Sequence, residues 1–102
     1  MHCDVHENSD DPTGATPYLL DVQTDLLADL ATCVVVPLVR VDAFGRRASR
    51  LHPTFIVDGE ELVMATHLLA AVRRRTLGGT VASLLKQRET IIAAIDVLWS
   101  GV

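Results

Sequence analysis

The sequence is poor in aromatic residues and has no long apolar run. One tryptophan, one tyrosine and two phenylalanines make up 4% of the 102 residues, whereas hydrophobic residues together make up 49%. We therefore expect a core of valine, leucine, isoleucine and alanine in one domain that spans residues 1–102. No apolar stretch approaches the ~20 residues that a membrane-spanning helix needs, and no secretory signal is visible. These shortages predict a cytoplasmic protein without a membrane segment.

Cysteine is also scarce, because only Cys3 and Cys33 are present. A disulfide between them stays open, but a lone pair without a secretory signal is typical of reduced thiols. Metal ligation by His2, Cys3 and His6 is the alternative. In an extended strand His2 and His6 share one face while Cys3 points away, so the three do not converge. We expect no metal site and no cofactor.

The chain has no excess of basic residues, and its formal net charge is -4. A free-standing nucleic-acid binder needs a concentrated basic surface, so we expect no direct contact with nucleic acid. Five of the nine basic residues nevertheless fall in two runs, Arg46-Arg47 and Arg73-Arg74-Arg75. Local basic patches are therefore compatible with an acidic whole.

Short apolar runs separated by turn residues predict a mainly β protein. The expected strands lie near Val5 and over residues 18–23, 33–40, 54–57, 61–66 and 68–74. Pro37 lacks an N–H for the ladder, which indicates an edge position or a bulge in its strand. Asp58-Gly59 suits the positive φ angles of a two-residue hairpin turn, in which Phe55 would face Leu62. Residues 7–16 and 43–49 read as loops.

The last segment changes to a helical period. From residue 84 onward an apolar stripe recurs at about 100° per residue, formed by Leu84, Ile91, Ile95, Leu98 and Val102. Trp99 lies inside the widened apolar arc, so we expect its side chain to pack, whereas Ser100 lies toward the polar side. Short strands followed by one helix describe an α+β protein or a small barrel with a helix laid across it.

Several ordered stretches carry a resemblance to a known family. They are residues 20–27 (LDVQTDLL), 35–38 (VVPL), His52-Pro53, Asp58-Gly59-Glu60, Met64-Ala65-Thr66 and the ending from Ala94-Ile95 to Gly101-Val102. Together they resemble the CcdB toxins over nearly the full length. The resemblance implies an SH3-like barrel with a small β-wing and a C-terminal α-helix. It also implies a homodimer that binds and poisons DNA gyrase through its A subunit and is neutralised by a CcdA-type antitoxin.

The resemblance assigns target contacts to several residues of this chain. They are Leu26, Leu27, Glu89, Trp99, Ser100, Gly101 and Val102. Gyrase-poisoning members end in an aromatic residue followed by Trp-Gly-Ile, so in an ungapped alignment Ser100 takes the place of the functional tryptophan. A homologue that has lost gyrase poisoning is therefore one alternative. The basic residues of the loop at 44–50, Arg46, Arg47 and Arg50, are candidate contacts for a disordered acidic antitoxin segment.

No group of residues predicts catalysis. Glu60 and Glu61 are adjacent in a strand and so point to opposite faces, and His52 and His67 read as ordinary polar positions. An RNA-cleaving toxin of the MazF and Kid type is a second alternative, because such toxins share the implied barrel. In that case the run 73–75 would stabilise the charge of the transition state. The other interpretations of this run are a charged edge strand and a partner contact.

Overall fold

A computed structural model describes residues 2–102, in which strands contain more residues than helices do. The strands are β1 Asp4–Glu7, β2 Tyr18–Asp21, β3 Thr32–Arg40, β4 Thr54–Val57, β5 Glu60–Met64, β6 Ala70–Arg73 and β7 Thr80–Ser83. The α-helices are α1 Val41–Phe44 and α2 Arg88–Ser100. Single 3-10 turns are η1 Asp25–Leu27, η2 Thr66–Leu68, η3 Arg74–Thr76 and η4 Leu85–Gln87.

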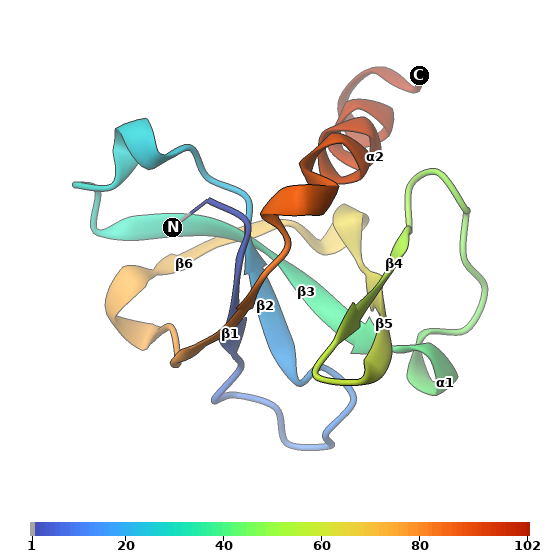
Figure 1. Ribbon diagram of the computed structural model, residues 1–102, viewed down its shortest axis with the longest axis horizontal. Coiled ribbons are helices and arrows are strands. Elements are labelled where there is room, and N and C mark those ends of the chain that lie inside the picture. Colours follow the sequence, from blue (N-terminus) through green and yellow to red (C-terminus); the bar gives the residue numbers. More distant parts are fainter. Residues whose placement is uncertain (1) are drawn as a thin grey trace.

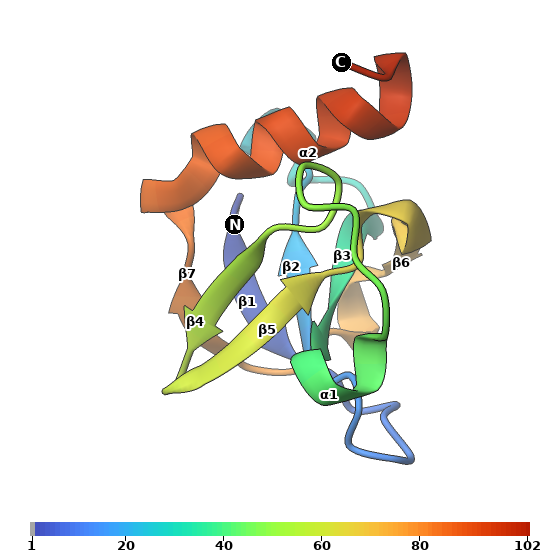
Figure 2. The ribbon, with the colours of Figure 1, turned by 90° about the vertical axis from the view of Figure 1, so that its right-hand side faces the viewer.

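The strands form one antiparallel sheet that curls into an open half-barrel (Figure 1). Its order is β4-β5-β3-β2-β1-β7, and β6 pairs separately with β3. Helix α2 lies across one end of this half-barrel, and its last turn rises away from the sheet (Figure 2). The predicted class, mainly β with a C-terminal helix, is confirmed.

Aliphatic side chains fill the concave side of the sheet, as the composition predicts. Leu20, Leu38 and Leu62 come from three different strands and are fully buried in one cluster. Helix α2 closes this cluster with Ile91 and Ala94, both also buried. The helix is therefore held to the half-barrel by its first two turns.

The hairpin between β4 and β5 has the predicted turn. Asp58 and Gly59 both adopt positive φ, at 50° and 77°, as a type I′ turn requires. Phe55 pairs with Leu62 across the two strands, so the expected register is confirmed. Both side chains are buried, which fixes this register because a slip by one residue would expose them.

Pro37 lies neither on an edge strand nor at a register shift of its strand, so the prediction of an edge position or a bulge was wrong. Strand β3 is central, with β2 on one side and β6 followed by β5 on the other. On that second side β6 pairs as far as Val35 and β5 begins at Leu38. The imino nitrogen of Pro37 falls in the gap between the two partners, where no ladder bond is required, while its carbonyl accepts from Ala65 N–H at 2.9 Å.

Two elements were not expected from the sequence. Strand β7 pairs with β1, and helix α1 occupies the first residues after β3. Each has only four residues, which is too short for a periodic pattern to stand out. Gly78 leads into β7 and packs against β1 so closely that a Cβ there would lie 2.6 Å from the carbonyl oxygen of Glu7. Within residues 2–102, the described helices include none long and apolar enough to cross a membrane.

Candidate functional site

The C-terminal turn of α2 carries an exposed tryptophan. Trp99 is 89% exposed, so the prediction that its side chain packs was wrong. Its position one turn after Ile95 does place it on the apolar side of the helix. The half-barrel, however, ends before the last turn of α2 (Figure 2), and the indole is left exposed. The direction of the side chain follows from the helical period, whereas the extent of the barrel does not.

The residues around Trp99 form an open tip. Gly101 ends α2 in the left-handed conformation, at φ 80°, and its N–H donates to the carbonyl of Val97 at 2.9 Å. Ser100 donates its hydroxyl back to the carbonyl of Asp96 at 2.8 Å. Val102 lies beyond the helix and is exposed. The chain end therefore presents an indole and an apolar terminus on a capped, ordered turn.

The two leucines of η1 lie at the same end of the molecule as α2 (Figure 1). Leu26 is 92% exposed and Leu27 is 44% exposed, so neither belongs to the core of a single chain. Thr24 caps the turn by accepting from Leu26 N–H at 3.3 Å. Glu89, in the first turn of α2, is also exposed. The structure thus brings the candidate target contacts to one end, on two separate elements.

The basic loop, residues 45–51, is fixed to the half-barrel through His52. The Arg47 guanidinium donates to the carbonyl of His52 at 2.7 Å, and the N–H of His52 donates to the carbonyl of Ala48 at 2.8 Å. Arg46 lines a hollow of about 410 Å³ beside Phe44. Arg46 and Arg50 are exposed and make no ion pair among the described residues. Two of the three candidate antitoxin contacts are therefore free, and Arg47 is engaged.

His52 and His67 form a hydrogen-bonded pair in which His52 is buried and His67 is exposed, and the sequence did not reveal this pair. His52 is 8% exposed, and its Nδ1 accepts from Ala48 N–H at 3.0 Å. Neutral His52 must therefore carry its proton on Nε2, which lies 2.9 Å from Nδ1 of His67 and donates to it. Phe44 packs edge-on against both rings. Spacing in the sequence gave no signal, because the two rings meet only through the fold.

Protonation of His52 is incompatible with the hydrogen bond that its Nδ1 accepts from Ala48 N–H. A proton on Nδ1 of His52 sets two N–H groups of His52 and Ala48 against each other. Burial lowers the pKa of His52 below its ordinary value, and the positive charges of His67 and Arg47 lower that pKa further.

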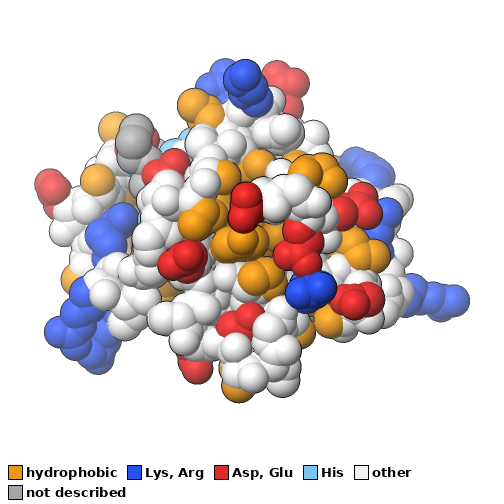
Figure 3. Space-filling view, turned by 60° about the horizontal axis from the view of Figure 1, so that its bottom comes forward, with side chains coloured by type: hydrophobic (Ala, Val, Ile, Leu, Met, Phe, Trp, Pro, Cys, Tyr) orange, Lys and Arg blue, Asp and Glu red, His pale blue; other side chains and the backbone are white. Residues whose placement is uncertain are grey.

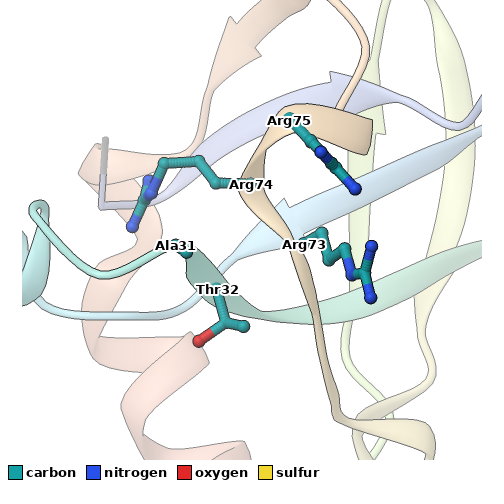
Figure 4. Close-up of a pocket in the computed structure, with 5 residues that line it drawn as sticks. All are labelled: Ala31, Thr32, Arg73, Arg74 and Arg75. Carbon is teal, nitrogen blue, oxygen red and sulfur yellow. The ribbon is translucent and has the colours of Figure 1, made fainter.

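The arginine hollow, of about 630 Å³, is lined by Ala31, Thr32, Arg73, Arg74 and Arg75. Arg74 points one way and donates its Nε–H to the carbonyl of Leu30 at 3.1 Å, whereas Arg73 and Arg75 extend to the other side (Figure 4). The lining contains no histidine or carboxylate that could act as a general base.

Acidic and apolar side chains gather at the end opposite α2 (Figure 3). Burial raises the pKa of the Tyr18 hydroxyl, and the neighbouring carboxylates of Asp58, Glu60 and Glu7 raise it further.

Among the described residues no group of three or more histidine, cysteine or carboxylate side chains could hold a metal ion. Both cysteines are free and buried, and burial raises the pKa of Cys33 to about 11.

The fold and its surfaces define a small, mainly β protein whose unusual side chains are exposed rather than gathered in an enclosed cleft. A family model described as CcdB protein matches residues 2–101. The chain therefore belongs to the CcdB family, the toxin components of toxin–antitoxin modules. No curated protein matches the chain.

Proposed function

We propose that this protein is a cytoplasmic toxin that acts as a homodimer, binds the A subunit of DNA gyrase and breaks no bond itself. The observation that carries the proposal is the exposure of Trp99 at the C-terminal tip. Tryptophan is enriched among the residues that dominate protein interfaces, and a fully exposed one contributes little to the fold of its own chain. Such a residue is suited to fill a pocket of a partner.

Further apolar residues at the same end support a binding surface there. The side chains of Leu26, Trp99 and Val102 are 92%, 89% and 71% exposed, respectively. Ile92 and Leu98 on α2 are about half exposed, at 49% and 42%. Exposed apolar side chains gathered on one element, as on α2 and its C-terminal tip, mark interaction sites in soluble proteins. We assign Leu26, Leu27, Glu89 and the C-terminal residues 99–102 to the target surface, and the half-exposed side chains of α2 to the dimer.

The antitoxin is proposed to be a CcdA-type protein with a disordered acidic segment. Arg46 and Arg50 are exposed on a loop that is itself held in place by His52. An ordered loop with free guanidinium groups recognises carboxylates without first losing its own conformational freedom. Arg47 contributes by fixing the loop, because its guanidinium already binds the carbonyl of His52.

A gyrase assay with a matched pair of variants tests the proposal. Trp99→Ala removes the exposed indole, and Ile56→Ala removes a 64% exposed apolar side chain on β4, outside the target surface. If Trp99 anchors the target, its loss weakens gyrase inhibition by about thirtyfold or more, equivalent to about 2 kcal/mol. Ile56→Ala should inhibit supercoiling and trap cleaved DNA as the parent protein does.

Two outcomes contradict the proposal. An unmodified protein that neither inhibits supercoiling nor traps cleavage has another target, which is the alternative of a member that no longer poisons gyrase. Cleavage of bulk RNA by the purified protein, lost in Arg73→Ala and Arg75→Ala, would establish the ribonuclease alternative instead.

A further inference from the structure

The outer edge of strand β6 is free for pairing. Within residues 2–102, β6 pairs only with β3. Arg74 N–H donates to the carbonyl of Ala31 at 2.8 Å, which makes Thr32 and Arg73 a non-hydrogen-bonded pair of the ladder. The backbone groups of Arg73 and Ala71 therefore point away from β3.

Three of these outward backbone groups have no partner in the described part of the chain. The carbonyl of Arg73 accepts from the Thr76 hydroxyl at 2.7 Å. The N–H of Arg73 and both the N–H and the C=O of Ala71 remain without a hydrogen bond. Ala70 and Ala71 are exposed, so solvent reaches this edge. Such an edge accepts an extended peptide, because main-chain groups on the peptide match those on the strand.

The charge beside this edge defines the chemistry of the peptide. Arg73 and Arg75 are exposed, extend to the same side of η3 (Figure 4), and form no ion pair among residues 2–102. Arg74 is different, because it is half-buried and fixes the carbonyl of Leu30. Two guanidinium groups next to a free edge attract carboxylates. They also repel the same edge of a second copy, which carries the same charges.

We propose that an extended acidic segment of a protein partner adds to the free edge of β6 and places its carboxylates on Arg73 and Arg75. This proposal depends on the proposed function in one respect, because it takes the antitoxin as the protein partner. A protein segment fits better than nucleic acid, because the free backbone groups pair with a peptide backbone and the chain as a whole carries a net charge of -4. Exposed Leu68 and Leu69, just before β6, add apolar surface for alternate side chains of the segment.

Synthetic peptides test the charge of the segment. The probe is a fluorescent peptide of about ten residues in which valine and glutamate alternate, and the control peptide carries glutamine in place of glutamate. Fluorescence anisotropy should show binding of the glutamate peptide alone. Arg73→Gln with Arg75→Gln should raise its Kd about tenfold. The matched control, Lys86→Gln with Arg88→Gln, removes the same charge at the start of α2 and should change Kd by less than about twofold.

A proline substitution tests the edge itself. Ala71→Pro removes an N–H that points away from β3, so it deletes no hydrogen bond of the ladder. It should leave the melting temperature nearly unchanged and weaken peptide binding. Should this variant fail to fold, N-methylation of alternate residues of the peptide makes the same test from the other side. Methylation in one of the two registers should abolish binding.

Three results would overturn the proposal. The first is an equal Kd for the parent protein and the Arg73→Gln/Arg75→Gln variant. The second is full binding of the N-methylated peptides in both registers. The third is tighter binding of a single-stranded oligonucleotide that the same arginine substitutions abolish. The peptide measurement requires no gyrase, so its failure and the failure of the gyrase assay are separate results.

Discussion

Acidification should release the basic loop from the half-barrel. A proton on Nδ1 of His52 removes the acceptor for the Ala48 N–H, so that hydrogen bond is lost while Nε2 of His52 still donates to His67. His52 is 8% exposed, so the group left without a partner is not rehydrated. A buried donor or acceptor without a partner costs about 1–3 kcal/mol. The loop that carries Arg46 and Arg50 is then held only by its remaining contacts.

The sign of the pH effect follows from the pKa of His52. Burial, with help from His67 and Arg47, lowers that pKa in the folded protein below the ordinary 6.5. The unfolded chain therefore binds more protons just below pH 6.5, and the free energy of unfolding falls as the pH drops. The fall ends once the pH lies below the folded pKa. One proton taken up on unfolding is worth at most 1.36 kcal/mol per pH unit, which limits how steeply the free energy of unfolding can fall.

Urea unfolding between pH 7.5 and pH 5 measures this loss. His52→Gln should be less stable at neutral pH and should lose most of the pH dependence. His6→Gln is the matched control, because His6 lies on β1, outside the basic loop, where its Nδ1 is 3.1 Å from the carbonyl of Gly78. The protection factor of the Ala48 amide, which is its exchange rate compared with that of an unstructured chain at the same pH, should fall over this pH range. The reasoning is refuted if His52→Gln keeps the pH dependence of the parent protein.

Three further predictions concern stability and reactivity. Gly78→Ala should lower the free energy of unfolding by about 1–3 kcal/mol, because the new Cβ would lie 2.6 Å from the Glu7 carbonyl oxygen. Gly79→Ala is the control, because a Cβ there has open space and should change this free energy by less than about 0.5 kcal/mol. Equal urea midpoints for the two variants would contradict this prediction. Trp99→Ala should also change stability by less than about 0.5 kcal/mol, since the indole is 89% exposed; a large loss would show that it packs within a protomer or a dimer. Cys33, with its pKa raised to about 11, should resist a thiol reagent at pH 8 in the folded protein and react only after unfolding; rapid labelling of the native protein would contradict its burial.

The sequence predicted those features of the fold that depend on neighbouring residues alone. The turn at Asp58-Gly59 and the pairing of Phe55 with Leu62 follow from backbone sterics and from the two-residue loop. Pro37 shows the limit of this reasoning. A missing N–H excludes a ladder bond at one site, but it does not reveal that two different strands share that side of β3.

The surfaces were harder to predict than the elements. The helical period gave the direction of Trp99, yet its exposure depends on where the sheet ends beneath α2. His52 and His67 lie fifteen positions apart, and their contact depends on the path of the loop between β3 and β4. The free edge of β6 is visible only once its pairing with β3 is known. Each of these features is set by tertiary structure, which no single stretch of sequence encodes.

The central claim is that the toxin acts by placing Trp99 in a pocket of its target. Because Trp99 is the only tryptophan of the chain, 5-fluorotryptophan gives one ¹⁹F NMR signal that a partner's own tryptophans do not obscure. The signal of the free protein should resemble that of a solvent-exposed indole. Addition of unlabelled gyrase A subunit should shift and broaden it, and Leu26→Ala should weaken the effect. A signal that stays unchanged at saturating gyrase A would contradict the account.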